Sequence, residues 1–337
     1  MKKVLIGILI FMLAYLAYHS QSVWYGLKQG YGQLKVISQA QSIESYIDEH
    51  EAYKNHKAKI EFIGFVKQFA IDSLGLEPSS SYEKIYDQKG QALMWLLTAS
   101  PEFELKAYEW SFPIAGKFSY KGFFDHEQAL KEKKALETEG FDVDLDEVSA
   151  WSTLGFLSDP ILSSMLTKDS AHLADLIIHE LFHSTVYLKD SVELNENRAS
   201  FVGRKGANAL LRSWGDTALI RKAEQKREKK RRIELVIKRS AEQLDSMYQS
   251  FDENLSLESK LRKKKEMIEK IRWKVAGMLA DGDLTKAEKL YLNFNPNNAY
   301  FTAYLTYRSK GDFFEKELKE EFDGDIVAFI AHYKELE

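Results

Sequence analysis

The chain contains no cysteine, and this absence excludes two kinds of architecture. Neither a disulfide-linked scaffold nor a metal site made of thiolate ligands can be built without it. The net charge is −4 over 337 residues, which is too small to indicate a nucleic-acid partner. The remaining composition is that of an ordinary globular protein, and the length suggests one large or two modest domains.

The sequence also lacks a clear signal-peptide cleavage site, although residues 1–20 have the pattern of a targeting element. Lys2 and Lys3 precede an uncharged apolar run at 4–18, as in a signal peptide or a short signal anchor. Large tyrosine and histidine side chains lie where small residues would mark cleavage, and a lipobox needs the missing cysteine. We therefore expect residues 1–20 to anchor the chain in a bacterial inner membrane, with the remainder periplasmic or otherwise extracytoplasmic. A cleaved signal peptide is the alternative, and it would export the domain equally.

The most informative stretch is an HExxH motif, formed by His179, Glu180 and His183. On an α-helix, residues four apart lie on one face, so the two imidazoles can bind one ion. A catalytic zinc takes three protein ligands and leaves a fourth position for water. Glu180 is rotated off the ligand face but can reach that water, accept its proton and pass the proton to a leaving amine. The motif therefore predicts a hydrolytic centre with one Zn²⁺ ion and with Glu180 as general base.

A third metal ligand is needed, and the strict metzincin extension does not supply it. That extension requires Gly at 186 and His at 189, where this chain has Val186 and Lys189. Glu196 is the better candidate, because it follows a plausible break at 189–191 and would open a second helix. Ala199, three residues further on, shares its face and is small enough to let the two helices approach closely.

The helix that carries the motif is otherwise nearly all apolar, which predicts a buried helix. Such a helix should not carry these polar groups unless a metal ion or hydrogen bonds satisfy them. We favour the metal site, and a merely hydrogen-bonded polar cluster is the alternative. Asp175, one turn before His179, is either a carboxylate that orients an imidazole or an exposed charge. His172 lies two turns from His179 and is not expected to be a ligand.

Residues 21–72 show apolar side chains at three- and four-residue spacing, which predicts helices. Stripes of this kind usually belong to a core, and we expect these to face one. The most N-terminal stripe consists of Trp24, Leu27, Tyr31, Leu34 and Ile37.

Residues 90–125 differ in their sequence pattern from the helical region before them. Residues 92–99 predict a strand, with a short helix as the alternative, and residues 112–124 predict extended segments with glycine kinks. A helix near 125–139 with Asp125 as its N-cap, and a short strand at 141–144, should follow. Residues 152–155 are either a sheet edge to which a substrate backbone could add as a strand, or an ordinary loop.

A charged region follows the motif. Residues 221–239 hold ten Lys or Arg against three Glu, and a second charged helix is expected from about 255 to 278. We expect residues 213–284 to form a long antiparallel helical hairpin inserted into a peptidase domain made of residues 21–212 and 285–337. The hairpin is either a solvated, salt-bridged insertion or a basic arm that contacts anionic lipid or a partner, and no nucleic acid is expected.

The C-terminal part returns to a packed pattern, with a turn at 295–298 and tyrosines on a predicted helix. Enzymes that form a tetrahedral intermediate often use a donor from a later segment to stabilise its oxyanion. Tyr304 and Tyr307 are candidates for that donor, and ordinary core tyrosines are the alternative.

Several blocks of the sequence resemble the bacterial putative aminopeptidase family of membrane-associated, zincin-like proteins. The resemblance spans about residues 30–330, and HExxH together with the run at 195–203 is its most specific part. The blocks are residues 32–34, 74–76, 112–116, 120–124, 152–155 with Asp159 and Pro160, 179–183, 195–201 and 297–299.

This resemblance implies a zinc-dependent peptidase that takes a peptide substrate, with a gluzincin-type ligand set of His179, His183 and Glu196 and with Glu180 as base. It implies an α+β, mostly α-helical fold in which an active-site helix pair accompanies a small β-sheet and the charged hairpin. The chain departs from the family in lacking a lipoprotein-type start, and it has no Gly-x-Met-Glu-Asn element to bind a free amino terminus. An endopeptidase therefore stays open. The alternative function is a membrane-anchored envelope interaction protein with a structural or vestigial zinc site.

Overall fold

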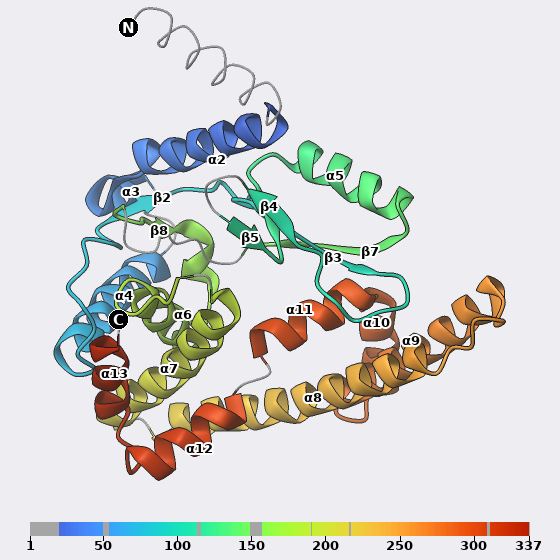
Figure 1. The fold of residues 1–337 in the computed structure, drawn as a ribbon. Coiled ribbons are helices and arrows are strands. Elements are labelled where there is room, and N and C mark those ends of the chain that lie inside the picture. Colours follow the sequence, from blue (N-terminus) through green and yellow to red (C-terminus); the bar gives the residue numbers. More distant parts are fainter. Residues whose placement is uncertain are drawn as a thin grey trace, which may run out of the picture.

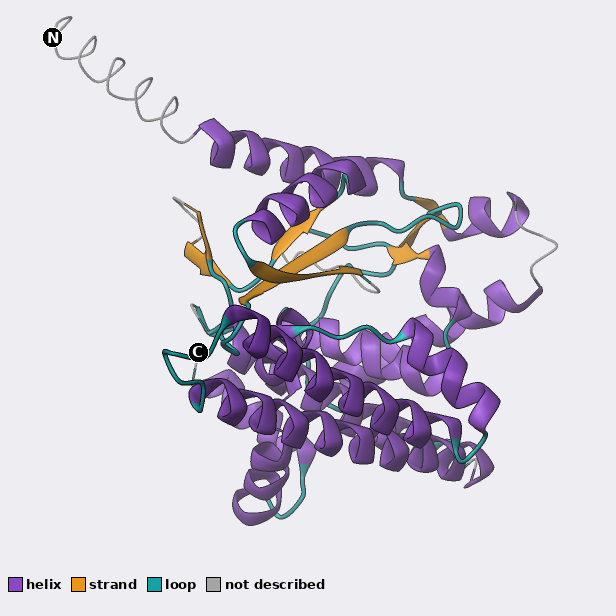
Figure 2. Cartoon of the chain, turned by 90° about the vertical axis from the view of Figure 1, so that its right-hand side faces the viewer, coloured by secondary structure: helices purple, strands orange, loops and turns teal. Residues whose placement is uncertain are grey.

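The described residues of the chain are mostly helical and carry three small sheets, which confirms the predicted α+β class (Figures 1 and 2). No helix among them is long and apolar enough to cross a bilayer. Residues 1–19 of the predicted anchor at 1–20, and the predicted sheet edge at 152–155, lie outside these residues. The computed structural model describes residues 20–49, 54–112, 116–148, 157–189, 191–215, 217–308 and 311–336.

The N-terminal region is helical, as its periodicity predicts, with α2 (Ser20–Gln39), α3 (Ile43–Glu49) and α4 (Lys54–Asp72). The prediction that the stripe on α2 faces the core is wrong. Its first four members are 61–71 % exposed, and only Ile37 is partly buried against the core. The helix packs by its opposite face, through Tyr25 and Val36, because that face meets the sheet and the central core.

The central sheet has the order β6 (Lys121–Phe123), β3 (Trp95–Pro101) and β7 (Phe141–Glu147), and both pairings are antiparallel. The apolar face of this sheet packs against α5 (His126–Thr138). Asp125 caps α5 by accepting a hydrogen bond from the Gln128 N–H, as predicted. The opposite face of the sheet packs against α11 (Asn298–Arg308). A helix on each side therefore encloses β3.

The other two sheets are smaller. One has the order β1 (Gln41–Ser42), β2 (Lys84–Tyr86) and β8 (Ile161–Leu162), and the other pairs β4 (Trp110–Phe112) with β5 (Gly116–Phe118). A short 3-10 helix, η1 (Ser163–Thr167), leads from β8 toward the central helix pair.

That pair consists of α6 (Ser170–His183) and α7 (Val192–Ser213), which pack more extensively on each other than any other two described elements. The apolar residues of α6 are buried, as its composition predicts. α4 covers α6 from one side, and α12 (Gly311–Glu321) and α13 (Ile326–Glu335) pack on α7. The helix pair thus lies at the centre of the largest hydrophobic core.

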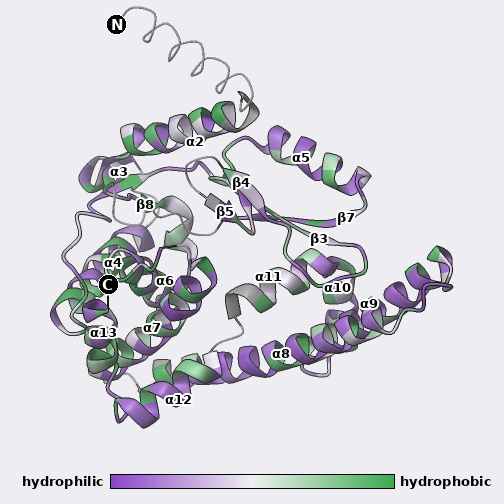
Figure 3. Ribbon diagram, in the orientation of Figure 1, coloured by the Kyte–Doolittle hydropathy of each residue, from purple (hydrophilic) through white to green (hydrophobic). Residues whose placement is uncertain are grey.

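The charged region forms the predicted hairpin, with α8 (Thr217–Gln249) and α9 (Leu257–Ala280) followed by α10 (Leu284–Asn293). Hydrophilic residues dominate the sequence of α8 (Figure 3). Its inner side is apolar, and Leu244 and Ile271 from the two helices share a second core with Phe301 of α11. A largely buried ion pair between Lys264 Nζ and Asp142 Oδ2, 2.7 Å long, ties α9 to β7.

Candidate metal centre

Small residues on α7 bring its backbone against α6. Ala199, Gly203 and Gly206 recur at four- and three-residue spacing; Ala199 is fully buried, and the two glycines lie against residues of α6. A Cβ atom on Gly203 would lie 2.6 Å from Asp175 Oδ1 and 3.2 Å from His179 Cβ. Because the contact with Asp175 is too short for real atoms and that with His179 is tight, glycine at 203 is what allows α7 to pass directly beside α6. The role expected of Ala199 in this approach stays a prediction, and the contacts of Gly203 show the close approach directly.

The connection between the two helices is fixed by a buried amide. Asn195 Oδ1 accepts a hydrogen bond of 2.9 Å from the Leu188 N–H, and Asn195 Nδ2 donates one of 2.7 Å to the Leu188 carbonyl. This two-point contact holds the loop after α6 against the first turns of α7. The helix α7 begins at Val192, so Glu196 lies in its second turn rather than opening it. Asn195 thereby positions the neighbouring Glu196 relative to α6.

Three side chains from these helices converge on one point. The Nε2 atoms of His179 and His183 are 3.1 Å apart. Glu196 Oε2 lies 3.6 Å from His179 Nε2, and Glu196 Oε1 lies 3.4 Å from His183 Nε2. Donor atoms at about 2.0–2.2 Å from a tetrahedral ion are about 3.3 Å apart, so this triangle has the dimensions of three ligands around one metal.

The chemistry of the donor set agrees with this geometry. Two neutral Nε2 acceptors cannot face each other at 3.1 Å unless a proton or a cation lies between them. Glu180 completes a group of three residues whose candidate ligand atoms all lie within 4.8 Å of one another. His179, Glu180 and His183 thus form a group that could bind a metal ion.

The two histidines differ in the partner of the second ring nitrogen, Nδ1, which points away from the donor triangle. His179 Nδ1 lies 3.5 Å from Ser200 Oγ on α7, which can orient the ring from the side away from the donor triangle. His183 Nδ1 is buried and has no hydrogen-bond partner among the described residues. Side-chain exposure is 3 % for His183, 18 % for His179 and 30 % for Glu196. The group is therefore reached from solvent on the side of Glu196.

The electrostatics of the centre favour a positive charge inside the triangle. Burial opposes ionisation of Glu196, but hydrogen bonds from His179 and His183 hold the pKa of its carboxyl well below the usual range. Burial disfavours the charged form of His179, whereas the hydrogen bond to Glu196 and the charge of Glu180 raise its pKa overall. The carboxylates thus favour a cation beside His179 Nε2, whether a proton or a metal ion.

Glu180 behaves differently from Glu196. Burial raises the pKa of the Glu180 carboxyl, and the two imidazoles only partly offset that effect. A carboxylate with a raised pKa accepts a proton more readily, which suits a general base.

The other candidate residues, Tyr304, Tyr307 and Asp175, differ in where they lie relative to the metal centre. Tyr304 lies in the second core and lines a cavity of about 500 Å³ together with Asn197 and Ser200, the latter of which contacts His179. The side chain of Tyr307 lies outside the described part of α11. Asp175 also lines this cavity, and its carboxylate lies against Gly203. The roles of these three residues in the chemistry stay predictions.

Two tyrosines near the centre were not among the sequence candidates. Burial raises the pKa of Tyr120, and the charge of Glu196 raises it further. Burial also raises the pKa of Tyr82, followed by the charges of Glu180 and Asp159. Both phenols therefore keep their protons and can act as hydrogen-bond donors.

Tyr82 is also held in an uncommon backbone conformation. Its φ is 67°, in the left-handed region, and its N–H donates a 2.7 Å hydrogen bond to the Asp159 carbonyl. Left-handed non-glycine residues with fixed partners often belong to functional sites. Tyr120 and Asp159 lie in blocks of the family resemblance, whereas no sequence signal identifies Tyr82.

The fold and the centre together define an HExxH-type candidate metal site on a buried helix pair. The profile of the family described as "Putative aminopeptidase" matches residues 24–337, and the chain belongs to this family. The match extends from α2 to the end of the chain. No curated protein and no solved structure matches the chain.

Proposed function

We propose that the protein is a zinc-dependent peptidase. The observation that carries this proposal is the convergence of His179 Nε2, His183 Nε2 and the Glu196 carboxylate into a triangle of metal-ligand dimensions, with Glu180 beside it. Membership of a putative aminopeptidase family suggests peptide substrates for this centre.

His179, His183 and Glu196 would hold the ion. Two imidazoles and one carboxylate are a donor set used by catalytic zinc, which keeps a fourth position for water or substrate. Zinc bound there would polarise the scissile carbonyl and lower the pKa of a water molecule.

The side chains of the protein perform the proton transfers. Glu180 accepts a proton from the attacking water, which its raised pKa favours, and delivers that proton to the nitrogen of the departing amine. A protonated phenol would stabilise the carbonyl oxygen as negative charge develops on it. Tyr120 joins Tyr304 and Tyr307 as a candidate for this donor, because the charge of Glu196 reaches its phenol.

The decisive experiment replaces Glu180 with Gln, which preserves the shape of the side chain but removes the base. The variant should keep its zinc, measured by elemental analysis, and should lose peptide hydrolysis by several orders of magnitude. Full activity in Glu180→Gln would refute the assignment of the base. A wild-type protein that binds stoichiometric zinc but cleaves nothing in a peptide library would favour a structural site in an envelope interaction protein.

The preference for amino termini is a separate part of the proposal, supported by the family description alone. Paired peptides with free and acetylated amino termini test it. An aminopeptidase should release one residue at a time from the free peptides and leave the acetylated ones intact. Internal cleavage of both sets would establish an endopeptidase instead.

The location of the enzyme is proposed from residues 1–20. Two lysines followed by fifteen uncharged apolar residues at 4–18 support an anchor in the bacterial inner membrane, with the peptidase domain on the extracytoplasmic side.

A further inference from the structure

The helix α2 presents a continuous apolar stripe to solvent. Trp24, Leu27, Tyr31 and Leu34 are 61 %, 61 %, 71 % and 64 % exposed. Their spacing of three and four residues places all four on one side of the helix. Figures 1 and 2 both show α2 along one edge of the molecule, on the side opposite α8. Four large apolar side chains in a row are more than the scattered exposure of an ordinary surface.

This stripe is not needed to hold α2 in place. The opposite face of the helix does so, through Val36 in the main core and through Tyr25, whose hydroxyl donates a 2.7 Å hydrogen bond to the Gly122 carbonyl. Gly32 lies so close to Phe124 that a Cβ atom there would clash with the ring. Substitutions in the stripe should therefore leave the fold intact.

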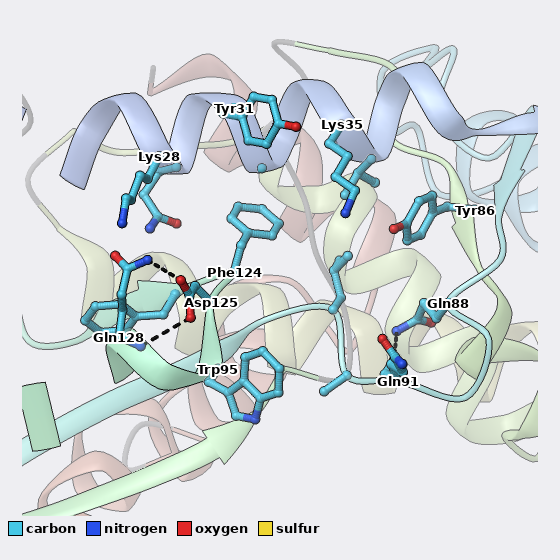
Figure 4. A pocket seen from close by; sticks show the side chains of 16 residues that line it. Lys28, Tyr31, Lys35, Tyr86, Gln88, Gln91, Trp95, Phe124, Asp125 and Gln128 are labelled. Carbon is cyan, nitrogen blue, oxygen red and sulfur yellow. Dashed lines mark hydrogen bonds between the residues drawn. The ribbon is translucent and has the colours of Figure 1, made fainter. Parts of the chain in front are cut away.

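The charged residues of α2 lie beside the apolar stripe. The sequence of α2 contains Lys28 and Lys35 and no acidic residue. Both lysines line a cavity of about 390 Å³ between α2 and the sheet, and Figure 4 shows both extending from the same side of the helix, Lys28 nearer Gln128 and Lys35 nearer Tyr86. Lys28 Nζ also lies 5.4 Å from the centre of the Trp24 ring. The helix thus has an apolar outer stripe with two cations along its edge.

We propose that α2 lies flat on the surface of an anionic lipid bilayer, with its stripe inserted among the acyl chains and Lys28 and Lys35 at the level of the headgroups. Interfacial helices combine an apolar face that carries Trp or Leu with flanking basic residues. Trp and Tyr favour this depth because their rings are both apolar and polar. The apolar run at 4–18 ends just before α2 begins at Ser20, so a bilayer that accepts the run is within reach of the stripe.

A second copy of the chain is a poorer occupant. Even at about 250 Å² for each side chain, four residues with these exposures present less than about 700 Å². A stable protein interface buries roughly 800 Å² on each partner. Two α2 helices would also bring four lysines together without an acidic residue between them.

The absence of cysteine makes a direct test available. Leu27→Cys and Leu34→Cys each give the full chain a single thiol for a nitroxide label, and Leu284→Cys and Leu292→Cys on α10 are matched controls. The control leucines are 79 % and 73 % exposed, so they are equally open to water. The labelled full-length proteins are reconstituted into phosphatidylglycerol-containing vesicles, and collisions with oxygen and with a water-soluble nickel complex are measured by electron paramagnetic resonance.

Labels at 27 and 34 should lose collisions with nickel several-fold and gain collisions with oxygen, whereas labels at 284 and 292 should stay aqueous. Adding Lys28→Gln and Lys35→Gln, or using uncharged phosphatidylcholine, should reduce the protection. The proposal would be overturned if labels at 27 and 34 stayed as accessible to nickel as the control labels. It would also be overturned if protection were equal in charged and uncharged vesicles. Protection in the absence of vesicles, with spin–spin broadening, would assign the stripe to a second copy instead. None of these measurements depends on peptidase activity.

Discussion

The helices α2 and α6 carry apolar residues at similar spacing but have opposite environments. α6 is enclosed by α4 and α7, and its His179, Glu180 and His183 are grouped around one point. α2 packs by one face and turns four large apolar residues to the outside. The spacing of apolar residues therefore identifies a helix but not what its apolar face contacts. In this chain the polar residues of the helix carry that information.

The largest effect of any substitution on either helix is expected at the candidate metal ligands of α6. His183→Ala should lose bound metal and reduce peptide hydrolysis by about three orders of magnitude or more, because a three-ligand site cannot hold its ion with two. His172→Ala, on the same helix but exposed, is the matched control and should keep both. Elemental analysis and peptide cleavage measure the two variants. Stoichiometric zinc in His183→Ala would contradict the ligand set.

The next largest difference between α6 and α2 should be the effect of an alanine substitution on the free energy of unfolding. Ile177 on α6 is fully buried, so Ile177→Ala should reduce the free energy of unfolding by about 2–5 kcal/mol. Leu27 on α2 is exposed, and Leu27→Ala should change it by no more than about 0.5 kcal/mol. Urea unfolding of the full chain, with and without detergent, tests the pair. A cost above 2 kcal/mol for Leu27→Ala would mean that the stripe is part of a packed core.

The close approach of α6 and α7 should be sensitive to a single methyl group. Gly203→Ala should destabilise the protein by about 1–3 kcal/mol and weaken metal binding, because the new Cβ atom meets Asp175 and the base of His179. Gly277→Ala in α9 is the control, since nothing lies within 4 Å of the added atom there. It should be neutral or stabilising by up to about 1 kcal/mol, as alanine is the better helix former. Equal effects of the two substitutions would show that the helix pair tolerates separation.

The smallest expected effect concerns a buried carboxyl group outside the metal centre. Burial raises the pKa of Asp144 on β7 to about 6, and the charge of Asp146 adds to this. Because the folded pKa is above the unfolded one, ionisation costs stability, which should fall as pH rises from about 4 to 6 and then stay level. Asp144→Asn should therefore stabilise the protein by about 1–2 kcal/mol at pH 7 and not at pH 4. Thermal unfolding across this pH range measures it, and a gain that is independent of pH would exclude the mechanism.

Local signals predicted much of the fold. Asp125 caps α5 as expected, and the apolar pattern located the helices within residues 21–72 and the buried helix α6. The centre was predictable because its donors lie within residues 179–196, where helix geometry fixes relative positions. Tyr82 and Tyr120 could not be predicted in this way, because they lie on segments far from the motif in the sequence. The orientation of α2 escaped prediction because an apolar stripe has the same spacing whether protein or lipid covers it.

The two hydrogen bonds between the Asn195 side chain and the Leu188 backbone, called the loop clamp below, have a consequence for the order in which the protein folds. All three candidate ligands lie within a stretch of eighteen residues, and the clamp closes the short connection between them. Closing so short a segment costs little chain entropy compared with the long-range pairing of the sheet. The helix pair can therefore gather its donors before the rest of the fold is complete, and an ion bound at that stage would contribute its binding energy to folding itself.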